Sequence, residues 1–323
     1  MGAAGSTPAP LGLLVNAAAR RVKRRDLGRE PFWRSLLPDP IVHITRSLDE
    51  LDQAVAAFRD QGVQVVAALG GDGSLHHLVE ALLRHHDEGD LPMVLALAGG
   101  TMNGLARALG TGGPPDRVLR AAVAVLAART PPPVESRHVL RVRDEISGRT
   151  HHGFGFGTGL VFRAFQDYYR DPEPNLIDAI RASLLPVKAA LFGGTFYDGA
   201  RLDVQVDHEP WLSEPPHSLL ASVVDNPLLW FRPFHSRLEG AAAFHLAATS
   251  MRSRELAPRL WSVFRGRCRH PRLRVGVITE ATVRGETGYL LDGDLYPSGG
   301  SVDVRLTVGP RLRFLVPKEP QSA

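Results

Sequence analysis

The chain has 323 residues, of which 44% are hydrophobic and 22% are charged, and its formal net charge is +4. These values predict a globular protein of about two domains and exclude a disordered or fibrous chain. The single Cys268 excludes an internal disulfide and a cysteine-based zinc site. No apolar run approaches the roughly 18 residues of a membrane span, so we expect a cytoplasmic protein.

The first 130 residues alternate between strand-like and helix-like patterns. Apolar runs predict four buried strands, at residues 11–15, 41–44, 63–69 and 93–98. Ser47 and Glu50 form a capping box that opens a helix. Four residues are predicted to share the apolar face of that helix: Leu48, Leu51, Val55 and Phe58. Alternation of strand, loop and helix predicts an N-terminal α/β domain with a parallel sheet.

Three consecutive prolines, Pro131 to Pro133, follow this region and indicate a connector. We therefore predict domains at residues 1–132 and 133–323. Short alternating runs predict a mainly β second domain, a β-sandwich, with strands near residues 139–142, 202–206, 219–224, 244–248, 273–278 and 302–306. Two helices are expected within it, at Leu176 to Leu191 and Arg254 to Phe264. A final strand, Leu312 to Val316, is compatible with either domain.

A glycine-rich segment, Gly70 to Ser74, lies between a predicted buried strand and a predicted helix. Glycines in that setting let backbone N–H groups approach a phosphate, and the helix N-terminus adds partial positive charge. Asp72 within the loop would repel phosphate unless it contacts magnesium or acts as a base. The alternative interpretation, that Asp72 and Ser74 only cap the helix, stays open.

A second strand-to-helix turn contains Gly99 to Asn103. Because the carboxyl ends of neighbouring parallel strands share one edge of a sheet, both loops are expected in one crevice. An ordinary tight turn, with Asn103 as a helix cap, is the alternative interpretation.

Taken together, GGDGS at Gly70 to Ser74 and GGTMN at Gly99 to Asn103 resemble the lipid kinase family that includes diacylglycerol and sphingosine kinases. Three further segments resemble this family in the same order: Leu11 to Asn16 as the opening strand, Gly155 to Gly159 as the central glycine turn, and Asp292-Gly293-Asp294 as the late acidic signature. The resemblance covers the whole chain.

The resemblance implies a nucleotide-binding N-terminal domain, a lipid-receiving β-rich domain, and ATP with Mg²⁺ as cofactors. Asp72, which contacts magnesium or acts as base, and Asp294 are the implied catalytic residues, and Asp292 and Gly293 are their implied supports. Nucleotide-binding residues are implied at nine positions: Asn16, Arg20, Gly70, Gly71, Gly73, Ser74, Gly100, Thr101 and Asn103.

Four departures from the family pattern concern phosphate and metal binding. Ala17 to Arg20 replaces a small hydroxyl and glycine, although Arg20, Arg21 and Lys23 supply positive charge. His77 stands where the family has a glutamate, and Gly104 stands where it has an aspartate. Asp294 itself is one methylene shorter than the glutamate of the family signature.

Other local features have both functional and structural interpretations. The basic run Arg20 to Arg25 suits phosphate, an anionic surface or a solvated helix face. Leu228 to Phe231 suits either membrane contact or the core. The doubled histidines fit no zinc spacing, since adjacent helical residues point about 100° apart.

The sequence therefore predicts an ATP-dependent lipid kinase whose acceptor is diacylglycerol or a sphingoid or ceramide-like alcohol. Its expected partners are a lipid substrate and, transiently, a membrane surface at which the protein is peripheral, with no nucleic acid. A homodimer remains an open option. An NAD kinase-like enzyme and a catalytically silent nucleotide or lipid sensor are the two alternative functions.

Overall fold

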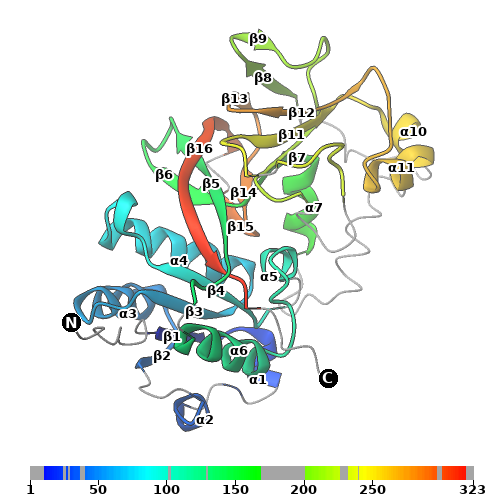
Figure 1. The fold of residues 1–323 in the computed structure, drawn as a ribbon. Helices are drawn as coiled ribbons and strands as arrows, with labels where there is room; N and C mark the ends of the chain where they lie inside the picture. The colour runs from blue at the N-terminus through cyan, green and yellow to red at the C-terminus, as the bar shows by residue number, and fades with distance from the viewer. Residues whose placement is uncertain are drawn as a thin grey trace. The chain divides into compact units, whose positions relative to one another are not determined.

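The computed structural model describes residues 11–24, 27, 30–36, 41–100, 103–128, 130–168, 201–225, 232–238, 240–296 and 300–317 (Figure 1). The chain divides into two compact units, Met1–Arg137 with Arg311–Ala323, and His138–Pro310. The division falls five residues after the predicted boundary, and the C-terminal segment belongs to the first unit. Of the described helices, none is long and apolar enough to cross a membrane.

The first unit is built on a parallel sheet with four strands in the order β2-β1-β3-β4, and the end of the C-terminal strand β16 (Val302–Leu315) pairs in parallel with β4. The strands are β1 (Leu11–Asn16), β2 (Ile41–Thr45), β3 (Val65–Gly70) and β4 (Met93–Ala98). Nearly every residue of β1, β3 and β4 is buried. Both faces of the sheet are covered, which explains why these strands are continuous apolar runs in the sequence. All four strands lie where the sequence predicts them, within two residues.

Helices cover both faces of this sheet (Figure 1). They are α1 (Arg20–Arg24), α2 (Glu30–Arg34), α3 (Leu48–Asp60), α4 (Asp72–His85), the 3₁₀ turn η1 (Glu88–Asp90), α5 (Gly104–Ala108) and α6 (Pro115–Ala127). The side chains of α1, α2 and α6 join one core around Trp33 and Leu119. On the other face Gly12 leaves room for the ring of Phe58 in α3, since a Cβ at residue 12 would lie 2.6 Å from that ring.

Helix α3 confirms Ser47 as its N-cap, but the Glu50 side chain bonds to Arg46 and not to Ser47, so half of the predicted capping box forms; one residue of the apolar face is also corrected. The Ser47 hydroxyl accepts the Glu50 N–H at 3.2 Å, and the Glu50 carboxylate accepts the Arg46 N–H at 2.6 Å. Leu51, Val55 and Phe58 are buried, but Leu48 is 57% exposed. Leu48 occupies the first position of the helix, before the turns that pack on the sheet.

The second unit contains two mainly antiparallel sheets, as predicted for the β-rich domain. One has the order β12-β11-β10-β7-β14-β15, and the other joins part of β16 to β13, β8 and β9, with β5 and β6 beside β16. Their strands are β5 (Val134–Asp144), β6 (Thr150–Gly153), β7 (Gly155–Gly159), β8 (Leu202–Val206), β9 (Glu209–Pro210), β10 (Ser218–Ser222), β11 (Phe244–Thr249), β12 (Leu273–Ile278), β13 (Glu280–Gly285), β14 (Tyr289–Leu291), β15 (Asp294–Tyr296) and β16 (Val302–Leu315).

Three expectations for this half of the chain need correction. The two predicted final strands form one strand, β16, within which the division between the units falls. The predicted helix at residues 254–264 is broken at Pro258 into α10 (Ser253–Leu256), the 3₁₀ turn η3 (Ala257–Arg259) and α11 (Leu260–Phe264). Gly155 to Gly159, expected as a turn, is the strand β7. The expected helix at residues 176–191 lies outside the described residues.

Glycines are needed in β7 because neighbouring groups approach its backbone closely. A Cβ on Gly157 would lie 2.6 Å from Val161 in α7 (Leu160–Tyr168), which packs on this sheet. Gly159 has φ +66°, and a Cβ there would overlap the carbonyl of His217. The glycine pattern therefore reflects close packing within a strand, which favours residues without a side chain.

Candidate active site

Two loops at the carboxyl ends of β3 and β4 pack backbone against backbone. The Gly99 N–H donates to the Gly70 carbonyl at 2.8 Å. A Cβ on Gly99 would lie 2.8 Å from the Gly70 nitrogen, and one on Gly100 would lie 2.5 Å from the Gly71 Cα. Any side chain at residue 99 or 100 would therefore push the loops apart, which gives a physical reason for the paired glycines.

The first loop is shorter than the sequence suggests, because α4 begins at Asp72 and Gly73 and Ser74 lie in its first turn. The Ser74 hydroxyl accepts the Asn16 amide at 2.8 Å and the Gly71 N–H at 3.3 Å. The Asn16 side-chain oxygen in turn accepts the Ala18 N–H at 2.8 Å. Ser74 and Asn16 thus join the end of β1 to the start of α4.

Asn103 plays the same part in the second loop. Its side-chain oxygen accepts the Gly100 N–H at 2.8 Å, and its amide donates to the Gly100 carbonyl at 2.9 Å. The residue is 5% exposed and adopts left-handed backbone geometry, with φ 49°. Asparagine is one of the few side chains that tolerates this geometry, so Asn103 fixes the shape of the loop before α5.

Asp72 is the acidic group of this site. Its carboxylate accepts the Leu105 N–H at 3.3 Å, which connects α4 to the start of α5. Burial raises the pKa of Asp72 above its ordinary value, although the N–H groups of Gly104 and Leu105 and the nearby charge of Arg107 oppose that shift. A carboxylate whose burial makes ionisation costly is well suited to accept a proton or bind a cation.

Basic residues come to the second loop from α1. The Arg21 guanidinium donates to the Ala98 carbonyl at 3.1 Å, and its backbone N–H donates to the Gly99 carbonyl at 2.9 Å. Arg20, the basic residue chosen from the sequence, is half-buried in the same short helix. The interaction of Arg21 with the strand end was not predicted, because a run of five basic residues gives no signal of which one turns inward.

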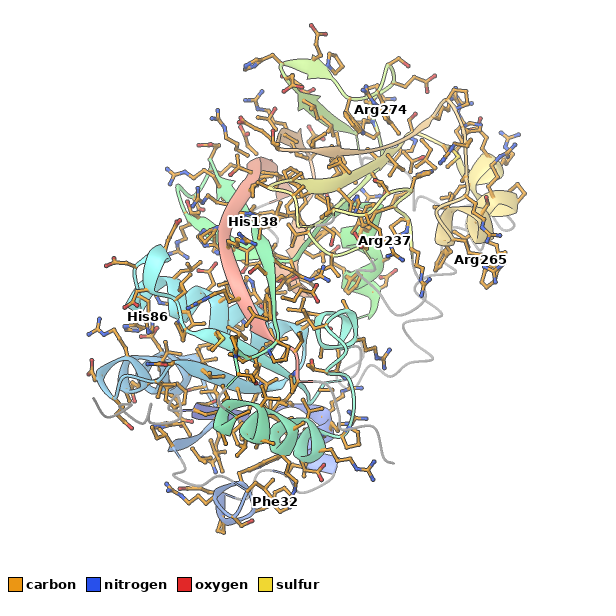
Figure 2. All side chains as sticks on the ribbon, in the orientation of Figure 1. Phe32, His86, His138, Arg237, Arg265 and Arg274 are labelled. Atoms are coloured by element: carbon orange, nitrogen blue, oxygen red, sulfur yellow. The ribbon has the colours of Figure 1, made fainter. Side chains whose placement is uncertain are left out.

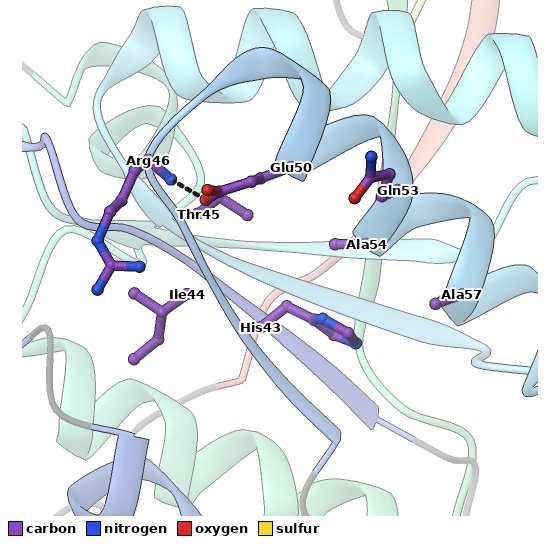
Figure 3. A pocket seen from close by; sticks show the side chains of 8 residues that line it. All are labelled: His43, Ile44, Thr45, Arg46, Glu50, Gln53, Ala54 and Ala57. Carbon is purple, nitrogen blue, oxygen red and sulfur yellow. Dashed lines mark hydrogen bonds between the residues drawn. The ribbon is translucent and has the colours of Figure 1, made fainter.

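A cavity of about 400 Å³ lies beside β2 and α3 in the same unit (Figure 3). It is lined by His43, Ile44, Thr45, Arg46, Glu50, Gln53, Ala54 and Ala57. Burial lowers the pKa of His43; the charge of Glu30 opposes this shift, and the charge of Arg34 adds to it. Thr45, at the end of β2, pairs with Asn16, at the end of β1. Strand β1 therefore lies between the strand that lines the cavity and β3, which leads into the first glycine loop. None of the predicted site residues lines it.

The late acidic signature forms a hairpin turn in the second unit. Asp292 and Gly293 join β14 to β15 with positive φ angles of 50° and 100°. The Asp292 carboxylate accepts the Phe154 N–H at 2.9 Å and the Gly155 N–H at 2.8 Å. A Cβ on Gly153 would lie 2.5 Å from this carboxylate. Asp292 therefore fastens the hairpin to the start of β7.

Asp294 begins β15 and is partly buried, directly after this turn. An aromatic stack supports the hairpin, because Tyr289 lies 4.8 Å from Tyr296 and 5.4 Å from Phe156 between ring centroids. The Tyr289 hydroxyl lies 3.4 Å from the Asp144 carboxylate, and burial raises its pKa, with a further contribution from Asp144. The hairpin that carries Asp294 is thus anchored on both sides.

Apart from Arg20 and Thr101, the predicted residues of the first unit come together at the two glycine loops. Asn16, Ser74 and Asp72 meet around the two glycine loops, with Asn103 and Gly100 in the second loop. Thr101 lies outside the described residues. Asp292, Gly293 and Asp294 belong to the second unit. Asn16, Ser74 and Asn103, interpreted from sequence as nucleotide ligands, use side-chain groups to shape the loops, and their contact with a nucleotide stays a prediction.

Three of the four departures from the family pattern lie in the first unit. Arg20 ends the changed segment and is the first residue of α1. His77 is half-buried on α4, with its ring 4.9 Å from that of His76. Gly104 begins α5, and its N–H faces the Asp72 carboxylate.

The chain is similar to known proteins in part of its sequence and in its fold. The family model of the diacylglycerol kinase catalytic domain matches residues 11–132. Among curated proteins, none matches the chain. A solved structure named "putative diacylglycerol kinase", from Bacillus anthracis str. Sterne, has a TM-score of 0.69 at 12% identity, covering 95% of this chain and 97% of that one. A second, named a diacylglycerol kinase from the same organism, has a TM-score of 0.60 at 12% identity, with the same coverage.

At that identity the solved structures establish the likeness of fold, an α/β unit followed by a mainly antiparallel β unit. The match of the family model covers both glycine loops, Asp72, Asn16 and Asn103. Residues 11–132 therefore match the family model of the diacylglycerol kinase catalytic domain, and the solved structures share the fold of the chain.

Proposed function

We propose that this protein is an ATP-dependent lipid kinase, which transfers the γ-phosphate of ATP to a hydroxyl group of diacylglycerol or of a sphingoid or ceramide-like lipid. The observation that carries the proposal is the position of Asp72, a half-buried carboxylate at the junction of two interlocked glycine loops. Phosphoryl transfer needs little more than positioned substrates, neutralised charge and a proton acceptor.

The start of α4 offers donors for phosphate. Leu75 makes the first N–H bond within the helix, to the Gly71 carbonyl at 3.2 Å. The N–H groups of Asp72, Gly73 and Ser74 precede it and therefore have no helical carbonyl four residues earlier. In a helix of fourteen residues, these donors and the helix dipole favour an anion.

The family implies Mg²⁺, and the chemistry of Asp72 fits that ion. Proteins bind Mg²⁺ through one or two carboxylates together with phosphate oxygens, so a single aspartate beside a phosphate-binding helix start is sufficient. Asp72 would hold the ion. When bound, Mg²⁺ neutralises charge on the transferring phosphoryl group. His77, which replaces an acidic residue of the family, does not add a second carboxylate.

Proton transfer from the lipid hydroxyl is the remaining task. As the acceptor oxygen forms its bond to the γ-phosphorus and ADP leaves, the hydroxyl proton passes to a carboxylate. As the alternative to holding Mg²⁺, Asp72 suits this role, because burial raises its pKa. Asp294, the other acidic group retained from the family pattern, is the second candidate for the same role.

The test is transfer of labelled γ-phosphate from Mg-ATP to a total lipid extract. We expect a labelled lipid with the native chain and a loss of about 10² to 10⁴-fold with Asp72→Asn. Asp52→Asn is the matched control, because Asp52 pairs with Arg84 and His85 on the outside of the same unit. Its activity should be unchanged.

Other outcomes would contradict the proposal. Label appearing only on NAD would indicate a soluble-substrate kinase. Binding of ATP without labelling of any acceptor would indicate a silent nucleotide sensor. If Asp72→Asn kept full activity, the role of Asp72 would be wrong even though the kinase assignment survived, and Asp294→Asn would then be tested in the same assay.

A further inference from the structure

One segment of the second unit carries a concentration of positive charge that the proposed reaction does not use. Residues 252–274 contain eight arginines and one acidic residue, a net charge of +7, whereas the rest of the chain has a net charge of −3. This segment forms α10, η3, α11 and the start of β12. Seven of its eight arginines are exposed: Arg252, Arg254, Arg259, Arg265, Arg267, Arg269 and Arg274.

Packing fixes which side of this segment faces outward. Leu256, Leu260 and Val263 pack around a small core with Met251 and Cys268. Between these apolar residues, the segment exposes Arg254, Pro258, Trp261 and Arg265. Trp261 is 66% exposed, more than any other large hydrophobic residue in the described part of the chain. The Arg265 guanidinium lies 4.4 Å from its ring centroid.

Backbone hydrogen bonds fix this segment, and several of its arginines are not neutralised by a carboxylate of the described residues. Gly266, with φ +61°, ends α11, and the Arg267 N–H donates to the Ser262 carbonyl at 2.8 Å. Arg272 is paired with Glu214 and Glu255. Among the described residues, no carboxylate forms an ion pair with Arg265, Arg267 or Arg269. Figure 2 shows Arg265 at the outer side of α11.

We propose that the surface formed by Arg254, Trp261, Arg265, Arg267 and Arg269 docks on the anionic face of a lipid bilayer. A tryptophan belongs at the boundary between headgroups and acyl chains, where its ring is buried and its N–H stays hydrated. Arginines around it pair with lipid phosphates. A single surface that combines an exposed aromatic ring with unneutralised arginines matches a bilayer surface, which supplies both environments side by side.

This surface shares no residue with the glycine loops, so its binding can be measured without phosphate transfer. The full chain is sedimented with vesicles of phosphatidylcholine alone or containing roughly 30% phosphatidylglycerol. We expect binding only to the anionic vesicles, and a loss of binding in about 0.5 M salt. Trp261→Ala should lower the partition coefficient about tenfold, because the buried ring area is lost. Arg265→Gln with Arg269→Gln should lower it about 25-fold, at about fivefold for each charge.

Matched controls come from the first unit. Phe32 is another exposed aromatic residue, at 41%, and Arg117 and Arg120 are exposed on α6. Phe32→Ala and the double change Arg117→Gln with Arg120→Gln should leave vesicle binding within twofold of the native chain. If they reduce binding as strongly as the changes at Trp261 and Arg265, vesicle binding depends on the overall composition of the protein surface and not on this surface, and the proposal is wrong.

Tryptophan fluorescence provides a second measurement that does not depend on weakened binding. The difference in emission between the native chain and Trp261→Phe isolates Trp261 from the other three tryptophans. Its emission should shift to shorter wavelength with anionic vesicles and stay unchanged with phosphatidylcholine. An unshifted Trp261 in a vesicle-bound chain would overturn the proposal. So would binding to a single-stranded oligonucleotide, sensitive to the same arginines, without any binding to vesicles.

Discussion

The loops around Asp72 and the hairpin around Asp292 both place an acidic side chain beside glycines, but they bind it differently. Asp292 accepts two short hydrogen bonds from the backbone of Phe154 and Gly155. Asp72 accepts a longer one, of 3.3 Å, from Leu105, and burial raises its pKa although the N–H groups of Gly104 and Leu105 oppose that shift. Asp292 is committed to the structure of its hairpin, whereas we propose that the charge of Asp72 serves a ligand. The two aspartates have similar neighbours in the sequence, but their hydrogen bonds differ.

The largest expected effect on stability is at Asp292. Asp292→Ala leaves two backbone N–H groups without their acceptor, so the hairpin should lose about 3 kcal/mol of stability. Asp207→Ala is the matched control, because Asp207 also has positive φ, 53°, in a hairpin turn of the second unit. Hydrogen exchange of β7 and β14 measures the difference. Equal effects in both variants would mean that backbone conformation, and not the carboxylate, stabilises the turn.

A smaller effect is expected where the glycine loops touch. Gly100→Ala places a Cβ 2.5 Å from the Gly71 Cα, so the loops must separate, at a cost of about 2 kcal/mol. ATP affinity, measured by calorimetry, should fall with it. Gly89→Ala is the control, since a Cβ there meets nothing within 4 Å. Unchanged affinity in Gly100→Ala would contradict the interlocked arrangement of the loops.

Ser74→Ala should have a milder effect on the same loops. The change removes the acceptor of the Asn16 amide and of the Gly71 N–H, with an expected loss of about 1 kcal/mol and weaker ATP binding. Ser47→Ala, at the start of α3, should also cost about 1 kcal/mol but leave ATP affinity unchanged. Thermal unfolding and calorimetry together distinguish a positioning role from a purely structural one.

The pH dependence of stability should have opposite signs at two aspartates of the first unit. The raised pKa of Asp72 means that its protonated form stabilises the fold at acid pH and that this contribution is lost as pH rises through the folded-state pKa. Asp72→Asn should therefore gain stability relative to the native chain at pH 7, and the gain should vanish near pH 3, below the ordinary aspartate pKa.

Asp52 supplies the contrast. Burial raises the pKa of Asp52, but bonds and charge from Arg84 and His85 outweigh it and leave the pKa lowered. Its contribution is present at neutral pH and lost as pH falls through the folded-state pKa, so Asp52→Asn should be less stable than the native chain at pH 7 only. Urea unfolding of both variants at the two pH values checks the signs. A common sign would show that the two environments do not differ.

Some features of the fold could not be predicted from local pattern. Leu48 matches the spacing of the apolar face of α3, yet it lies outside the part of the helix that packs on the sheet. The glycines of β7 suggest a turn, because the sequence does not reveal that Val161 and Asp292 approach that strand. Pro258 breaks the helix between α10 and α11, and only the packing of Leu256 and Leu260 shows that both pieces remain against one small core.

By itself, the sequence determined the strands of the parallel sheet, the order of strand, loop and helix, and the two glycine loops with Asp72. These features are encoded by runs of neighbouring residues, and a strand with both faces buried needs an apolar run wherever it lies. Tertiary structure alone decided how the polar side chains are used. Asn16 bonds to a residue 58 positions away, Asp72 to one 33 away and Asp292 to one 138 away. Such partners meet only because the packed sheets bring the ends of distant strands together. A local sequence pattern cannot specify a partner that lies so far along the chain.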